Sequence, residues 1–121
     1  MKSVDLFMDR ELKKYLKDIL CSINEIETFV SQYPCRYDVF CSTPILIRAV
    51  QMNIAIIGEA TNRILKIRED ITITNARKIV NTRNYVIHGY DSLRYEILWA
   101  IVIKDLPLLK VEVKSIIDNI G

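Results

Sequence analysis

Apolar residues recur at steps of three and four along most of the chain, which is the period of an amphipathic helix. The clearest stripe lies near the N-terminus and consists of Leu12, Leu16, Ile19, Ile23, Ile26 and Val30. Polar residues between these positions predict a solvated opposite face with Lys13, Lys14, Lys17, Asp18, Asn24, Glu25 and Glu27. The pattern is interrupted at residues 33–37, which include Pro34, so a first long helix is predicted to end before them.

A second helix is predicted from residues 42–44 to about Ile67. Thr43 is suited to cap its free amides, and Pro44 is tolerated in a first helical turn. The predicted helix carries two apolar rows, one with Leu46, Val50, Ile54, Ile57 and Ile64 and the other with Ile45, Ala49, Met52, Ile56 and Ala60. An apolar face this wide favours burial on two sides, against the rest of the bundle and against a second subunit.

The remaining sequence also predicts helices. Residues 68–74 should form an extended connection, and a third helix should begin at Thr74 or Asn75 and end near His88, because Gly89 is a natural stop. Residues 92–106 have a helical pattern that is apolar all round in its middle, and Pro107 is predicted to start a last helix. The expected fold is all-α, an antiparallel four- to five-helix bundle that forms a single domain over residues 1–121.

Composition narrows the function classes. The chain has 121 residues, of which half are apolar, and its 17 basic and 15 acidic residues give a net charge of +2, too near neutrality to indicate nucleic-acid binding alone. The three cysteines, Cys21, Cys35 and Cys41, lack a C-x-x-C spacing, and with one histidine they do not predict a zinc site or a disulfide framework. Without a secretory signal pattern or a membrane-spanning apolar run, the sequence predicts a soluble, cytoplasmic protein without a cofactor.

One dense polar cluster remains as a candidate site, at residues 83–91, and it contains the only histidine. On a helix, Asn84 and His88 lie one turn apart on one face, with Arg83 beside them. Arginine supplies a permanent forked charge for phosphate oxygens, and histidine transfers protons near neutral pH. Residues 63–94 carry seven basic and three acidic residues, so positive charge gathers around this cluster.

Spacing alone leaves structural interpretations open. A histidine at a helix end is often a cap or a satisfied core residue, and Arg83 with Asn84 would also suit a hydrogen-bond network between helices. Cleavage of RNA also needs both a general base and a general acid, whereas each chain has one histidine. A two-fold dimer would remove this difficulty by placing two copies of the cluster in one cleft.

Residues 83–90 fit the R-N-x-x-x-H-x-Y pattern of HEPN domains and resemble the HepT toxin family in particular. Residues 57–60 look like the I-G-E-A segment of that family, and Asp91, Trp99 and residues 105–107 follow in the expected order. The resemblance covers roughly residues 5–120. It implies a helical bundle that dimerises so that two R-x-x-x-x-H motifs share a cleft.

The resemblance also implies a function, that of a metal-independent endoribonuclease in a type VII-like toxin–antitoxin pair. Arg83 would stabilise the transition state, His88 would transfer protons, and Asn84 would orient the histidine or hold a phosphate oxygen. The antitoxin would be an MntA-like nucleotidyltransferase that adenylylates the tyrosine of H-x-Y, here Tyr90. The alternatives are a non-catalytic binding or regulatory subunit of a nucleotidyltransferase and a purely structural dimer.

Glu59 and two tyrosines also have both a structural and a functional interpretation. Glu59 is expected to hold a basic side chain across the bundle rather than to act in catalysis. Tyr85 and Tyr95 are of a type that stacks on RNA bases, although aromatic residues at helical spacing more often pack against the protein.

Overall fold

The computed structural model describes residues 2–87 and 94–120, and all regular structure within these ranges is helical. The helices are α1 (Lys2–Val30), α2 (Tyr37–Cys41), α3 (Pro44–Ile67), α4 (Ala76–Ile87), α5 (Tyr95–Ala100), a π-helical turn η1 (Ile101–Asp105) and α6 (Leu106–Ile120). The predicted all-α bundle is therefore confirmed. The short α2 was not anticipated, because it lies between the break at residues 33–37 and the predicted start of the second helix.

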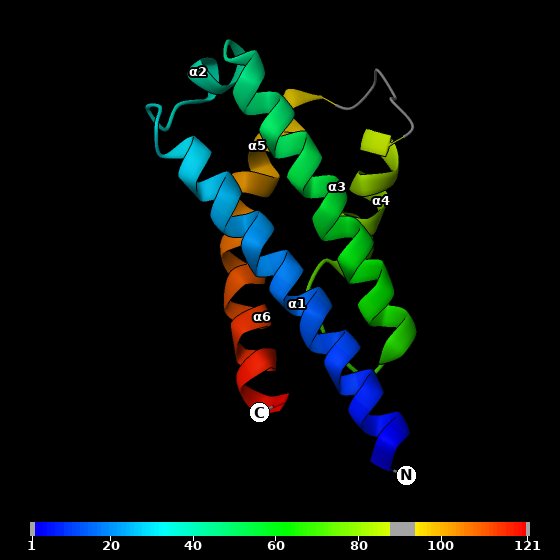
Figure 1. Cartoon of the computed structure of the whole chain (residues 1–121). Helices are drawn as coiled ribbons and strands as arrows, with labels where there is room; N and C mark the ends of the chain where they lie inside the picture. Colours follow the sequence, from blue (N-terminus) through cyan, green and yellow to red (C-terminus); the bar gives the residue numbers. More distant parts are fainter. Residues whose placement is uncertain (1, 88–93, 121) are drawn as a thin grey trace.

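The long helices α1 and α3 run antiparallel and lie side by side, as Figure 1 shows. α4 packs against α3, and α6 packs against α1 (Figure 1). An ion pair between Lys78 and Asp105 joins α4 to η1. The α1 stripe of five residues from Leu12 to Ile26 is at most 1% exposed. Burying a stripe of this size supplies the main driving force for the packing of α1.

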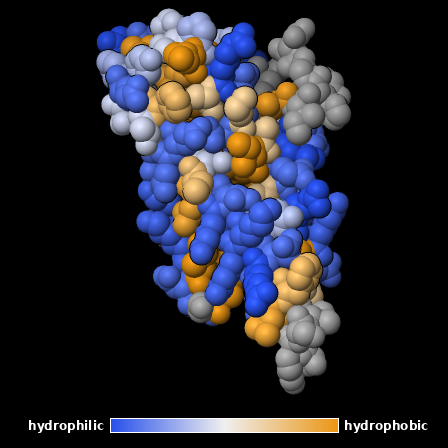
Figure 2. Space-filling view, in the orientation of Figure 1, coloured by the Kyte–Doolittle hydropathy of each residue, from blue (hydrophilic) through white to orange (hydrophobic). Residues whose placement is uncertain are grey.

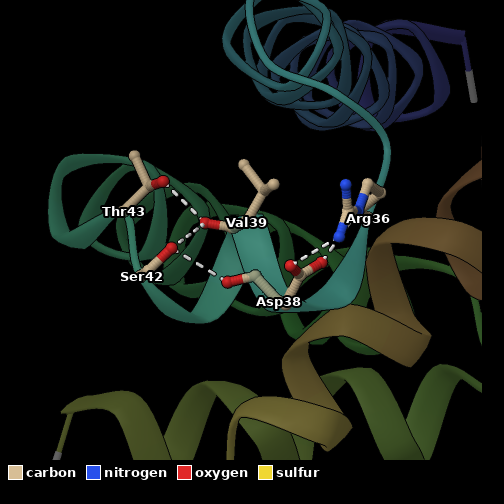
Figure 3. Close-up of polar contacts among 5 residues, drawn as sticks. All are labelled: Arg36, Asp38, Val39, Ser42 and Thr43. Atoms are coloured by element: carbon tan, nitrogen blue, oxygen red, sulfur yellow. Dashed lines mark hydrogen bonds and ion pairs between the residues drawn. The ribbon is translucent and has the colours of Figure 1, made fainter.

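The junction of α2 and α3 corrects the expected role of Thr43 (Figure 3). α3 begins at the predicted position, with Pro44 in its first turn, but the Thr43 side chain makes no capping bond. Its hydroxyl instead donates a 2.6 Å hydrogen bond to the Val39 carbonyl oxygen at the end of α2. Ser42 donates to the carbonyl oxygen of Asp38, whose carboxylate pairs with Arg36. These hydroxyl groups therefore satisfy carbonyls of α2 rather than amides of α3.

The connection between α3 and α4 has neither helix nor strand, as predicted, but turns at residues 69–70 and 74–75 interrupt the stretch expected to be extended. Asn75 precedes α4 with a φ of 64°, a left-handed conformation that asparagine tolerates better than most residues. The neighbouring Thr74 is held from outside, since its hydroxyl donates a 2.6 Å hydrogen bond to the Glu112 carboxylate of α6. This contact ties the start of α4 to the last helix.

The last helix is predicted to start at Pro107, whereas the structure shows no break in the helical backbone at this proline. The backbone stays helical from α5 through α6, and the π-helical turn η1 lies directly before the proline. At the end of this turn the Leu106 amide donates to the Ile101 carbonyl, five residues earlier. A wider turn relieves the crowding that a proline ring causes in an α-helix, and Pro107 follows as the second residue of α6, after Leu106.

The two apolar rows of α3 have different surroundings. The row with Leu46, Val50, Ile54, Ile57 and Ile64 is buried, whereas in the other row Ile45 is 62% exposed, Met52 68% and Ile56 44%. On the face drawn in Figure 2, hydrophobic side chains form separate spots between hydrophilic ones. Within the described parts of the chain, no helix combines the length and hydropathy needed to cross a lipid bilayer.

Candidate functional site

The candidate cluster begins on the last turns of α4, which carry Arg83 and Asn84. The other predicted site residues, His88 and Tyr90, lie outside the described residues, as do Gly89 and Asp91. The described part of the site is therefore the arginine half of the motif and the helices that hold it.

The guanidinium group of Arg83 is held on two sides. Its Nη1 forms an ion pair and hydrogen bond with Oε1 of Glu59 on α3. Its Nη2 donates a 2.7 Å hydrogen bond to Oδ1 of Asn84, the next residue of α4. The Arg83 side chain is 19% exposed, so the group is mostly buried but still reaches the surface. Charge-assisted hydrogen bonds of this kind fix a long flexible side chain in one position.

Gly58 explains how the arginine comes so close to α3. A Cβ atom at position 58 would overlap Cβ of Arg83 and would lie 3.0 Å from its Cγ and 3.2 Å from the Ile79 carbonyl oxygen. Only glycine therefore lets α4 approach α3 this closely without a shift of the backbone. The adjacent residue Glu59 then faces the guanidinium group.

Glu59 is shared by two arginines. Its Oε2 accepts a 2.9 Å hydrogen bond from Nε of Arg63, one turn further along α3. This hydrogen bond lowers the pKa of Glu59 below its ordinary value, and the charge of Arg83 acts in the same direction. Two guanidinium groups on one carboxylate leave the cluster with a net positive charge, which suits an anionic ligand such as a phosphate group.

A surface pocket of about 280 Å³ lies on the other side of Glu59, between α3 and α1. Its lining combines small apolar side chains with one aromatic ring and two carboxylates, from Tyr15, Asp18, Ala55, Ile56, Glu59 and Ala60. The hydrogen-bonded cluster of Arg83 is thus connected to the surface of α1 through Glu59.

The structure confirms the expectation that Glu59 holds a basic side chain across the bundle, and it identifies that side chain as Arg83. It also brings in Arg63, which the sequence analysis did not single out. The signal for Arg63 was available, because it follows Glu59 by four residues on one helix. Tyr15 and Asp18 gave no such signal, since their place beside Glu59 depends on how α1 crosses α3. Tyr85 and Tyr95 are 46% and 43% exposed.

Comparison with known protein families shows to which family the chain belongs. A sequence model of the family described as "Ribonuclease HepT-like" matches residues 19–116, which include α3, α4 and the whole candidate cluster. The chain belongs to the HepT-like ribonuclease family. The resemblance expected from residues 83–90 and 57–60 is therefore confirmed at the level of the family.

Several relatives match this member of the HepT-like family over nearly their full length. "Putative RNase MJ1380" of Methanocaldococcus jannaschii is 34% identical over 88% of this chain and 97% of its own length. "Probable ribonuclease HepT" of Thermococcus cleftensis is 33% identical over 85% of this chain and 93% of its own. "Putative RNase TTE0752" of Caldanaerobacter subterraneus is 31% identical over 88% and 95%. No solved structure matches the chain.

Proposed function

We propose that this protein is a metal-independent endoribonuclease toxin whose active site combines Arg83 and His88 from two copies of the chain. The observation that carries the proposal is the fixed guanidinium group of Arg83, held at the end of α4 by Glu59 and Asn84. It stands five residues before the single histidine, in a chain of the HepT-like ribonuclease family. RNA is accordingly the substrate.

The proposed reaction is a transesterification within RNA. The 2′-hydroxyl of one nucleotide attacks the adjacent phosphorus, and the bond from phosphorus to the 5′-oxygen breaks. One His88 accepts the proton of the 2′-hydroxyl, and a second His88 donates a proton to the leaving 5′-oxygen. The products are a 2′,3′-cyclic phosphate and a 5′-hydroxyl end.

Arg83 stabilises the additional negative charge on the phosphate oxygens in the transition state, an effect commonly worth about 3 kcal/mol. Asn84 accepts the Arg83 hydrogen bond through its carbonyl oxygen. The amide nitrogen of Asn84 is then the end that would hold a phosphate oxygen or orient His88.

A homodimer supplies the second histidine in this scheme. The exposed row of α3, with Ile45, Met52 and Ile56, is the apolar surface that a second subunit would cover. Pairing of two chains by this row would also bring together two Glu59–Arg83 clusters, because Glu59 follows Ile56 by less than one turn of the same helix.

Regulation by an antitoxin follows from the same motif. An MntA-like nucleotidyltransferase would transfer an adenylyl group to the hydroxyl of Tyr90, two residues after His88. The added phosphodiester would place negative charge and bulk beside the Arg83 cluster. It would then compete with the substrate phosphate for the guanidinium group and block cleavage.

The proposal is tested with purified protein and a labelled single-stranded RNA in the presence of a chelator. His88→Ala should lower the cleavage rate at least about 100-fold, because it removes both proton-transfer groups of the dimer. Arg83→Lys keeps the charge but loses the fork of hydrogen bonds, and should lower the rate by a similar factor. The product ends should be a 2′,3′-cyclic phosphate and a 5′-hydroxyl.

Circular dichroism and mass measurement of each variant show whether the helices and the dimer persist. Cleavage by His88→Ala at the parental rate would contradict the proposal, and so would cleavage that stops when the chelator is added. A parent that binds RNA without cutting it would instead favour the binding-subunit alternative.

A further inference from the structure

A shallow groove of about 440 Å³ on α1 is lined almost entirely by basic side chains. Arg10, Lys13, Lys14 and Lys17 form its lining, and Asp18 closes one end. The groove lies on the face of α1 that the sequence pattern predicts only to be solvated. Figure 2 shows hydrophilic side chains gathered over the middle of α1.

The four basic residues occupy positions i, i+3, i+4 and i+7 of the helix, so they form one stripe about 10 Å long. Like charges at this spacing repel one another on a helix, and the stripe therefore gains from an anion that neutralises several of them at once. An extended polyanion fits the stripe better than a single small anion.

The basic groove borders the pocket that reaches Glu59 of the candidate site. Asp18 lines both this groove and the pocket that contains Tyr15 and Glu59. Glu59 in turn holds Arg83. Lys14 extends over the Tyr15 ring, with its Nζ atom 4.9 Å from the ring centroid, at the border between the two hollows. An RNA strand held at Arg83 would have to cross the surface beside Glu59, Tyr15 and Asp18 to reach the basic stripe.

We propose that the basic groove of α1 binds the sugar–phosphate backbone of the RNA substrate on one side of the scissile phosphate. This inference rests on the proposed ribonuclease function and adds a second contact region, on a different helix from the R-x-x-x-x-H motif. Contacts to the sugar–phosphate backbone do not depend on the base sequence, so the groove strengthens binding of every RNA that reaches the site. The Tyr15 ring between the two regions offers an apolar surface against which one base stacks.

The test uses Lys14→Gln/Lys17→Gln, a double variant of two exposed residues in which glutamine keeps a good helix propensity. Its matched control is Lys104→Gln/Lys114→Gln, which removes the same charge from exposed positions of η1 and α6. Affinity is measured with a 2′-O-methyl single-stranded RNA that cannot undergo cleavage, over a series of salt concentrations. Circular dichroism verifies that both double variants remain folded.

The groove variant should bind this RNA about tenfold more weakly at 0.1 M salt, because two phosphate contacts are lost. The slope of log affinity against log salt concentration should become shallower by about 1.4 for the same reason. The control variant should change neither quantity by a comparable amount. On a cleavable RNA at subsaturating concentration, the groove variant should lose cleavage in proportion to affinity.

Equal RNA binding by the parent and the groove variant would overturn the inference even if the parent cleaves RNA. Equal losses in the groove and control variants would also overturn it, because they would reflect net charge alone. Loss of binding to a nucleotidyltransferase with unchanged RNA binding would make the groove a protein interface instead. A parent that does not cleave RNA would contradict the proposed function, whereas the uncleavable RNA would still test the groove.

Discussion

Helix α3 has two packed sides that differ in chemistry. Toward α1 the contact is mainly apolar, with Leu16 fully buried, and it includes one hydrogen bond from Asn53 of α3 to Glu25 of α1. Toward α4 the contact depends on the absence of a side chain at Gly58 and on the ion pair between Glu59 and Arg83. The first contact draws its stability mainly from buried apolar area, whereas the second uses close approach to fix one charged group.

The difference teaches which changes should affect folding and which should affect the site. Apolar burial is not directional, so a loss at the α1 side lowers stability and leaves the shape of the site intact. Hydrogen bonds and close backbone approach are directional, so a change at the α4 side moves a functional group even when its energetic cost is small. Substitutions on the two sides of α3 separate these effects.

The largest stability loss is expected for Leu16→Ala on the apolar side. Leu16 is fully buried, and its truncation removes apolar contacts and leaves a cavity, which costs about 2–5 kcal/mol. Urea unfolding should show this loss, while RNA cleavage per folded molecule should stay near the parental value. A Leu16→Ala variant that keeps the parental stability but cleaves RNA more slowly would contradict this distinction between the two sides of α3.

An intermediate effect is expected for Gly58→Ala on the polar side. In an open helix position this change stabilises a protein by up to about 1 kcal/mol, because alanine is the better helix former. Here the new Cβ would overlap Arg83, so we expect a destabilisation of about 1–3 kcal/mol. Cleavage per folded molecule should also fall, since α4 must move with Arg83. A more stable variant in thermal unfolding would contradict this prediction.

The smallest stability effect is expected for Glu59→Gln. The Glu59 side chain is 42% exposed, so the loss of its ion pairs should cost only about 1 kcal/mol at neutral pH. The pKa of Glu59 is lowered in the folded state, mainly by the hydrogen bond from Arg63. Its contribution is therefore fully present above its ordinary pKa of 4.5 and is lost as pH falls through the lowered value.

The stability difference between the parent and Glu59→Gln should accordingly narrow as the pH falls below about 4.5, as measured by urea unfolding at several pH values. Asp38→Asn is the matched control, because its ion pair with Arg36 is more exposed, at 67% and 68% of the side chains. This control should change stability by less than about 0.5 kcal/mol. A larger loss in Asp38→Asn than in Glu59→Gln would show that burial does not rank these pairs.

Much of the fold could be predicted because helical periodicity reports burial directly. The stripe from Leu12 to Ile26 is buried as its spacing predicts, and α3 begins and ends within the expected residues. Thr43 was assigned the wrong partner because its hydroxyl has two groups within reach, and only the path of α2 decides between them. The π-helical turn before Pro107 was missed because a proline in sequence looks the same whether a helix restarts or widens.

The candidate site was predictable in part for a similar reason. Arg83 and Asn84 are neighbours in sequence, and the role of Glu59 followed from the charge that it carries inside a bundle. The basic stripe of α1 was treated as a solvated face, because sequence spacing does not show where Asp18 and Tyr15 meet Glu59. The place of Asp18 and Tyr15 beside Glu59 depends on how α1 packs against α3, and it appears only in three dimensions.

The carboxylate shared by Arg63 and Arg83 affects how much conformational entropy Arg83 loses when it binds a ligand. A solvent-exposed arginine side chain loses several rotatable degrees of freedom when it binds a ligand, and this entropy loss weakens binding. At position 83 that loss occurs once, when the chain folds, and the acceptor that imposes it is itself held in place from the next turn of α3. A phosphodiester that binds at Arg83 as proposed would therefore meet a cation that is already ordered.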